Sequence, residues 1–533
     1  MNHYQQSPAI QEGQRNSESS HNSHDLPEKS IIYEPPTLEL IHRLCRTLAA
    51  ERITYCHWKS NNALDLSASG ENDLDLLIGR ADASRFVEIL YRLGFKHAKA
   101  AEQKQMPGVL DYFGYDEKAD KLIHVHAHYQ LTLGHDMTKN YRLPIERAFL
   151  ESAVQGDLFK VPAPEFEFIV FVIRMVLKHA TWDVIFGRQG KLKTVERREL
   201  AWLQARINYD RVYGILQQHL PYISAELFNN CIRALQPACP IWTRVRTGQQ
   251  LQSMLQANAR RSLPMDVYLK FTRRAALAIR RRIFKSSPKY RLDRGGAMIA
   301  IVGGDGAGKS TAVDALYSWL SHYFAVSRIH LGKPTWSWTT ITVRAVLKVG
   351  QLVGLYPVET SLRETLEQES LVSPGYPWLV REVLRARDRY LLYRKARRFA
   401  ATGGLAILDR FPLAQFRLMD GPRTERFVDE LTKGPHAKRF MSPHRDSPFV
   451  KRLRRREQDY YRRIVRPDVL IVLRVDPEVA VQRKTDEDPA FVRARNTEIW
   501  ELNWEDVDAH LIDGGKSKKE VLSAVKALLW LEL

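Results

Sequence analysis

The stretch Ile299-Ala-Ile-Val-Gly-Gly-Asp-Gly-Ala-Gly-Lys-Ser-Thr311 decides the fold of the C-terminal part of this chain. It starts as an apolar strand and continues directly into the spacing Gly-x-x-x-x-Gly-Lys-Ser, the P-loop pattern, which an amphipathic helix follows. Glycines let successive backbone N–H groups turn inward around a polyphosphate, and the helix N-terminus adds the positive end of its dipole. The pattern therefore predicts a nucleotide site formed by Gly303, Gly304, Asp305, Gly306, Ala307, Gly308, Lys309, Ser310 and Thr311.

Two side chains of this loop have separate expected roles. Lys309 would reach the β- and γ-phosphates of the nucleotide, and the Ser310 hydroxyl would ligate Mg²⁺. ATP and Mg²⁺ are accordingly the expected cofactors.

Length, charge and cysteine content limit the class of protein. A chain of 533 residues is too long for one hydrophobic core, so two or three domains are expected. The net charge of +20 favours anionic partners such as nucleotides, nucleic acid or an acidic surface. None of the four cysteines forms a Cys-x-x-Cys pair, which argues against a disulfide framework or a zinc site and for a reducing cytoplasm.

The N-terminal half is expected to contain a tail and an α+β domain with a helical extension. Residues 1–34 are rich in Ser, Gln, Asn and His and lack an apolar core segment, so we expect a disordered tail and neither a signal peptide nor a membrane anchor. Residues 35–285 form the expected domain. Its pattern predicts helices over 37–50 and 83–93, strands over 74–78 and 122–127, and mostly helix from 165 to 283. The longest apolar run, 166–177, is too short to span a bilayer and predicts a buried helix.

The C-terminal domain is expected over 289–533, after a boundary near Ser286-Ser-Pro288. Long helical patterns alternate there with apolar strands, which predicts a parallel five-stranded sheet with helices on both faces. The segment 411–448, rich in proline, predicts a long loop beside the site. The five expected strands are 298–302, 326–331, 405–408, 469–475 and 509–512.

Four motifs in this domain resemble the thymidylate kinase family of nucleoside monophosphate kinases. The loop matches that family's Gly-x-Asp-Gly-x-Gly-Lys-Ser-Thr version of the P-loop, and the Asp-Arg motif after the third core strand stands at Asp409 and Arg410. A Pro-Asp-led strand follows at 466–484, and a closing strand, turn and helix at 511–521. The resemblance implies an ATP-dependent transferase that phosphorylates a nucleoside monophosphate or a similar phosphorylated acceptor.

Site residues follow partly from chemistry and partly from this resemblance. Asp409 ends a parallel strand, where open α/β sheets bind ligands, and can hold Mg²⁺ through water, while Arg410 can clamp the acceptor phosphate. By resemblance, Asp305 would face the acceptor's sugar hydroxyl, and Arg389 would lie near its base. The family's mobile lid, which supplies cations to the transferring phosphoryl group, corresponds to Arg483, Arg493 and Arg495.

The acceptor side departs from the family pattern. Where thymidylate kinases have Arg-Glu-Pro-Gly-Gly-Thr, this chain reads His330-Leu-Gly-Lys-Pro-Thr-Trp336, so Pro334 is retained and Lys333 is a candidate phosphate contact. An insert rich in Trp, Val and Leu follows, and Met419-Asp-Gly-Pro-Arg423 replaces the usual Ser/Tyr-rich segment. The donor half of the site is therefore expected to be intact, and the identity of the acceptor stays open.

The N-terminal half carries its own acidic motif, Asp73-Leu-Asp75, on an expected strand. Alternation along a strand places both carboxylates on one face, where they could hold a divalent metal. Together with Trp58-Lys59-Ser60 and His126-Ala-His128-Tyr129, the motif resembles the uncharacterised bacterial nucleotidyltransferase-like family, with His126 where a third carboxylate is usual. Both an active transferase and a degenerate nucleotide-binding or structural domain are open. A zinc site on His124, His126 and His128 is the less favoured interpretation, since no cysteine accompanies them.

Basic helical segments at 381–398 and 451–466 suggest an alternative function. Nucleic-acid binding is one interpretation, but no dedicated nucleic-acid-binding motif is recognisable. Attraction of polyanionic nucleotide substrates, together with solvated helix faces, accounts for the positive charge. The leading expectation is a kinase. A nucleotide-binding regulatory or scaffold protein without turnover and a basic nucleic-acid-binding protein are the alternatives. Expected partners are nucleotide substrates, a homodimer is compatible with the sequence, and no membrane span is expected.

Overall fold

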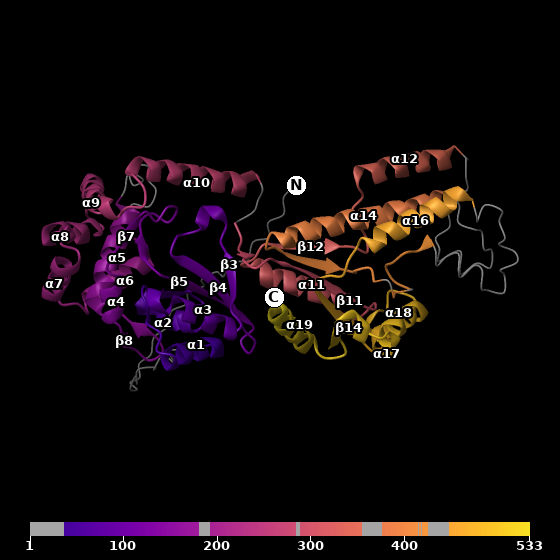
Figure 1. The fold of residues 1–533 in the computed structure, drawn as a ribbon, viewed down its shortest axis with the longest axis horizontal. Helices are drawn as coiled ribbons and strands as arrows, with labels where there is room; N and C mark the ends of the chain where they lie inside the picture. Colours follow the sequence, from indigo (N-terminus) through magenta and orange to yellow (C-terminus); the bar gives the residue numbers. More distant parts are fainter. Residues whose placement is uncertain are drawn as a thin grey trace, which may run out of the picture.

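The computed structural model describes residues 37–180, 192–283, 288–353, 376–413, 415–416, 418–424 and 447–533. The expected tail 1–34, the domain boundary at 286–287 and most of the expected loop 411–448 lie outside these residues. Figure 1 shows the N-terminal half, in purple, beside the C-terminal half, in orange and yellow, with the two sheets meeting near the middle of the chain's long axis.

A six-stranded mixed sheet forms the N-terminal half. Its strand order is β1-β2-β5-β4-β3-β10, with β2 and β5 parallel and the other neighbours antiparallel. Helices α1 (Glu39–Ala50) and α3 (Ala83–Arg92) cover one face because their apolar residues recur every three or four positions. The strands are β1 (Tyr55–His57), β2 (Leu74–Ile78), β3 (Lys96–Lys99), β4 (Val109–Asp116), β5 (Lys121–His128) and β10 (Arg291–Leu292).

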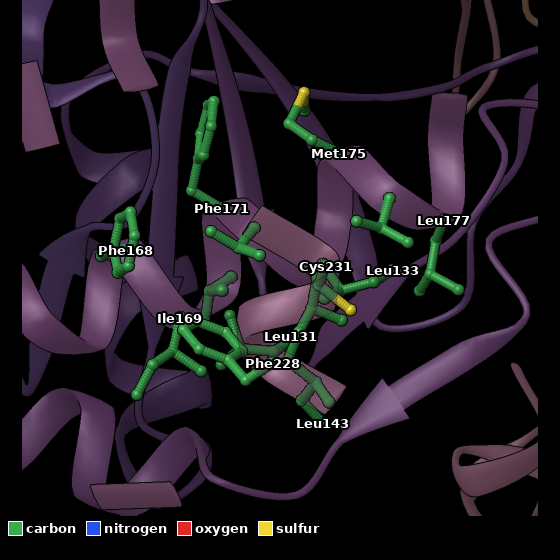
Figure 2. Packing of buried hydrophobic residues seen from close by; sticks show 14 of the residues in the cluster. Leu131, Leu133, Leu143, Phe168, Ile169, Phe171, Met175, Leu177, Phe228 and Cys231 are labelled. Atoms are coloured by element: carbon green, nitrogen blue, oxygen red, sulfur yellow. The ribbon is translucent and has the colours of Figure 1, made fainter. Parts of the chain in front are cut away.

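The helical extension is built around α5 (Pro164–His179), which is buried on nearly every side. Figure 2 shows Phe168 and Ile169 of α5 packing with Phe228 and Cys231 of α8 (Ala225–Ala234). The buried helix expected at 166–177 is therefore confirmed, and none of the helices in the described ranges is long and apolar enough to cross a bilayer. The other elements of this layer are α4 (Glu146–Glu151), α6 (Thr194–Gln204), α7 (Tyr209–His219), α9 (Ile241–Met254), α10 (Leu263–Ile283), β6 (Leu131–Leu133) and β7 (Tyr141–Leu143).

The C-terminal half is a parallel five-stranded sheet in the order β12-β13-β11-β14-β15. The five strands expected from the sequence are present, and the P-loop strand β11 is central: β11 (Ala297–Gly303), β12 (Val326–His330), β13 (Leu405–Asp409), β14 (Val469–Arg474) and β15 (His510–Asp513). One face packs on α11 (Lys309–Ser321) and α19 (Lys518–Glu532), the other on α14 (Tyr376–Ala401). Three further helices complete the described part of this half: α16 (Pro448–Arg462) packs against α14, and α17 (Pro477–Arg483) packs against α18 (Pro489–Glu501).

The two halves share a core at their junction. Strand β10, at the start of the C-terminal half, completes the N-terminal sheet by pairing with β3. Phe113 of β4 packs in the same apolar cluster as Phe324 and Trp530, and the Trp530 indole donates to the Gly94 carbonyl at 3.0 Å. Independent folding of 289–533 stays a prediction, and such a fragment would expose the aromatic side of this cluster to water.

Candidate active site

The P-loop lies between the end of β11 and the first turn of α11. Gly306 and Gly308 adopt positive φ values of 81° and 85°, which a side chain would oppose. Gly308 is the N-cap residue and has no side chain to occupy the N–H groups of the first turn of α11, which leaves those donors to a bound anion. The local sequence thus folds into the anion-binding turn that its spacing predicts.

Helix α18 holds the loop from outside. The Asn496 amide donates to the Asp305 carbonyl at 2.9 Å and to the Val492 carbonyl at 2.8 Å. The contact is so close that a Cβ on Gly304 would lie 2.0 Å from the Asn496 Oδ1 atom. Glycine at 304 is therefore required for packing against α18.

Lys309 and Asp305 form the charged centre of the loop. The Lys309 ammonium is buried, donates to the Gly304 carbonyl and lies 3.8 Å from Asp305 Oδ1. Burial lowers the pKa of Lys309 to about 8, although Asp305 opposes the shift. Burial also acts to raise the pKa of the Asp305 carboxyl, but Lys309 and Arg495 outweigh it and hold that pKa below its ordinary value. Asp305 thus lies among cations on the donor side of the site, and its expected contact with an acceptor hydroxyl stays a prediction.

Asp409 meets the requirements of an indirect magnesium ligand. It ends β13, opposite Ile301 of β11, and is 4% exposed. Its Oδ1 atom has no hydrogen-bond partner in the part of the chain that the structure describes. A buried carboxylate oxygen needs a cation or a cation's water to offset its desolvation, so Asp409 and the exposed Ser310 hydroxyl fit the expected Mg²⁺.

Arg410 stands between two hollows of the surface. Its backbone has φ 60°, a conformation that costs a non-glycine residue free energy and is found at functional sites. Its guanidinium lies 3.2 Å from Asp305 and 4.0 Å from Asp420. On one side it borders a small hollow with Asp305 and Lys309, and on the other it borders a larger pocket.

The larger pocket has a volume of about 430 Å³ and is called here the acceptor pocket after the role that the sequence predicts for Lys333 in its lining. Its lining holds seven basic and two acidic side chains, so a dianionic ligand would enter a strongly positive site. The charged residues that line it are Lys333, Arg344, Arg381, Arg385, Asp388, Arg389, Arg410, Asp420 and Arg423. Lys333, a candidate phosphate contact in the sequence, is among them, as is Pro334.

Asp388 and Arg389 of α14 lie in the same wall but have different surroundings. Arg389 is 1% exposed and donates to the carbonyls of Leu331 and Gly332, at 2.8 and 3.1 Å, and to Asp420. Asp388 is equally buried, yet neither of its carboxylate oxygens has a hydrogen-bond partner among the described residues. Arg389, expected near the acceptor base, therefore mainly bonds neighbouring segments of the pocket wall to one another. Asp388, which sequence reasoning passed over beside it, is the group left for a ligand.

The three arginines expected in the lid are not brought together. Arg495 ion-pairs with Asp305 and so reaches the P-loop. Arg483 instead donates to the carbonyls of Gly514 and Gly515, at 2.7 and 3.2 Å. Arg493 is half exposed and pairs with Glu478 at 2.6 Å. In this arrangement Arg495 alone of the three contacts a residue of the P-loop.

A second polar site, called here the histidine–carboxylate cluster, lies on the N-terminal sheet and comprises Asp73, Asp75, Asp111, His124, His126 and His128. The expected Asp73 and Asp75 do share a face with the alternating histidines of β5. Asp111 on β4 was missed, because a single aspartate in an alternating strand has no local signature; it stands opposite His126 in the sheet register. Burial alone would lower the pKa of His124, but Asp111 and Asp73 on either side of the ring raise that pKa to about 9.

The comparisons with known proteins are distant. No family model matches the chain. It is 27% identical over 234 residues to the uncharacterized ATP-binding protein YghR of Escherichia coli strain K12, covering 42% of this chain and 83% of that protein. The protein of the same name from Escherichia coli O6:H1 matches to the same extent. Among solved structures, thymidylate kinase from Candida albicans aligns with 16% identity and a TM-score of 0.25, over 44% of this chain and 91% of that one.

Proposed function

We propose that this chain is an ATP-dependent, Mg²⁺-requiring kinase that transfers the γ-phosphoryl group to a phosphate-bearing small molecule, most simply a nucleoside monophosphate. The observation that carries the proposal is the adjacency of two hollows that share Arg410 and Asp420 in their linings. One hollow also contains Asp305 and Lys309 of the P-loop, and the other is the acceptor pocket. The name of the bacterial relative supports ATP as the donor.

The proposed transfer uses side chains from both hollows. Lys309 and the N–H groups at the start of α11 hold the β- and γ-phosphates, and Asp409 with Ser310 would hold a magnesium ion. Bound there, Mg²⁺ would neutralise charge on the phosphate oxygens. An oxygen of the acceptor's phosphate forms the new bond to the γ-phosphorus, the bond from that phosphorus to the β,γ-bridging oxygen breaks, and ADP leaves. Arg410, between the two hollows, stabilises the negative charge on the group in transit.

The acceptor pocket supports a small, strongly anionic acceptor. Its volume of about 430 Å³ falls in the range of small-molecule sites. Seven basic side chains against two acidic ones favour an acceptor with more than one negative charge. Asp388 has no hydrogen-bond partner in the ranges that the structure describes, which favours a hydroxyl or amine donor on that acceptor. The four free cysteines accord with action in a reducing cytoplasm.

An acceptor screen with labelled ATP tests the proposal. Nucleoside monophosphates, sugar phosphates and their bisphosphate counterparts would be offered with Mg²⁺, and product would be followed by transfer of label. Lys309→Ala should abolish transfer, while Lys519→Ala, which removes an exposed lysine of α19, should not change it. Tight ATP binding without transfer to any acceptor would instead identify a regulatory or scaffold protein. Salt-sensitive nucleic-acid binding without ATP binding would identify the third alternative.

Nucleotidyl transfer by the N-terminal half has weaker support. The Lys59 ammonium lies 2.7 Å from Asp75, so one member of the aspartate pair already has a cationic partner. Release of pyrophosphate from nucleoside triphosphates that survives Lys309→Ala but is lost in Asp73→Asn would establish this second activity.

A further inference from the structure

The histidine–carboxylate cluster brings imidazole and carboxylate atoms into one small volume. The His126 Nε2 atom lies 3.2 Å from Asp111 Oδ1 and 3.9 Å from Asp73 Oδ2. Ligand atoms of Asp73, His124 and His126 all lie within 4.8 Å of one another. From this convergence we infer that Asp73, His124 and His126 bind a divalent transition-metal ion, with Asp111 beside it.

Asp75 has a different part in this arrangement. It accepts from the His126 Nδ1 atom at 3.2 Å, which turns Nε2 of the same ring toward Asp73 and Asp111. Carboxylates commonly orient the histidine ligands of metals in this way. The same Asp75 Oδ1 atom also receives Lys59, at 2.7 Å, and His128, at 3.4 Å, so this oxygen is already engaged by three side chains. Asp75 is therefore a positioning residue, and the ligand set differs from the adjacent aspartate pair that the sequence suggests.

Access and donor type indicate the kind of metal. The side chain of Asp73 is 43% exposed and that of His126 is 24% exposed, so an ion can enter from solvent and keep an open coordination position. A mixed set of nitrogen and oxygen donors suits Zn²⁺, Co²⁺ or Mn²⁺, whereas Mg²⁺ prefers oxygen ligands.

The cluster also touches the C-terminal half. The Tyr290 ring lies 5.2 Å from the His124 ring, and its hydroxyl interacts with Asp111. Tyr323, just after α11, lies 6.0 Å from the same imidazole. A metal here would fix side chains against which both halves pack, so its binding is expected to stabilise the folded chain as a whole.

Metal binding to the full-length chain, stripped with a chelator and free of nucleotide, tests the inference. Equilibrium dialysis with Zn²⁺ should give one ion per chain, and Co²⁺ should give the visible absorption of a site with a nitrogen ligand. His126→Ala and His124→Ala should lose this ion and the rise in melting temperature that Zn²⁺ gives the wild type. Asp75→Asn should weaken Zn²⁺ by about 10–100-fold while keeping the stoichiometry and the Co²⁺ spectrum.

The matched control is His97→Ala, which removes a histidine of the same sheet that has one carboxylate partner, Asp293, at 2.8 Å. This variant should bind Zn²⁺ as the wild type does. Unchanged binding in His126→Ala would overturn the inference. So would Mg²⁺ binding as tight as that of Zn²⁺ and lost in Asp75→Asn but not in His124→Ala, which would assign the ion to the adjacent aspartate pair. ATP binding at the P-loop, measured on the same variants, reports their folding and is independent of this outcome.

Discussion

Replacing Asp388 with asparagine should affect stability and catalysis in different ways. Its carboxylate is 1% exposed and has no hydrogen-bond partner among the described residues, so no such bond is lost from the empty protein when the charge is removed. If the carboxylate accepts a bond from the acceptor, that charge-assisted bond contributes about 1.5–3 kcal/mol to binding. Since about 1.4 kcal/mol corresponds to a factor of ten, kcat/KM should fall by roughly 10–150-fold. The free energy of unfolding should change by less than about 1 kcal/mol.

Asp420 provides the matched comparison in the same pocket. It accepts from the buried Arg389 and lies 4.0 Å from Arg410, so Asp420→Asn breaks an existing buried pair. Loss of one partner of such a pair costs about 3–5 kcal/mol. Urea unfolding and steady-state kinetics on both variants would separate the two roles. A loss of about 3 kcal/mol of stability in Asp388→Asn, with catalysis unchanged, would refute our assignment and make Asp388 structural.

Four further outcomes are expected. Because the pKa of Lys309 is lowered to about 8 in the empty site and phosphates favour its charged form, ATP binding should take up a proton at pH 8.5–9 and almost none at pH 7. Calorimetry in buffers of different ionisation enthalpy measures this proton uptake. Equal uptake at the two pH values would contradict a lowered pKa of Lys309 in the empty site. Asp409→Asn should cut turnover by orders of magnitude while nucleotide affinity, measured by calorimetry, changes little; equal loss of both would indicate a structural role. Gly304→Ala should cost about 1–3 kcal/mol of stability, since the new Cβ meets Asn496, and adding Asn496→Ala should recover part of it in urea unfolding. Loading the histidine–carboxylate cluster with Zn²⁺ should change the Kd for ATP by less than about fivefold, and a larger change would reveal coupling between the sites.

The sequence predicted the parts of the fold whose signals are local. The P-loop strand at 297–303 is a continuous apolar run followed at once by the glycines that its turn requires, and α5 is an apolar run of helical length. The two-residue strand β10 has no such signal. Its pairing with β3 joins residues nearly two hundred positions apart and is determined by how the two halves pack. Short pairings of this kind follow from tertiary contacts, which a pattern along the chain does not contain.

The same distinction holds within the site. Asp409 and Arg410 were predictable because a strand end fixes where their side chains stand. Arg483 and Arg493 were expected beside Arg495, but which of the three reaches Asp305 depends on how α17 and α18 are rotated about their axes. The roles of Asp111 and Asp388 depend on the residues that the fold places around them. Asp111 contacts two imidazoles of the next strand, whereas Asp388 lies in a wall of arginines and has no hydrogen-bond partner within the described part of the chain.

Helix α11 connects the two candidate sites physically. The P-loop lies at its N-terminus, and Tyr323 and Phe324, which contact the N-terminal sheet, follow its C-terminus (Figure 1). Its 13 residues span about 20 Å. Contiguity alone does not transmit binding energy, because coupling requires an element with two arrangements that both ligands bias. The apolar side of α11 is buried between the parallel sheet and α19, with Val313, Leu316 and Leu320 inaccessible to solvent, so a second packing would have to break the core of the C-terminal half. We therefore expect α11 to stay rigid, so that it holds both sites in place while ligand binding at one site leaves the affinity of the other unchanged.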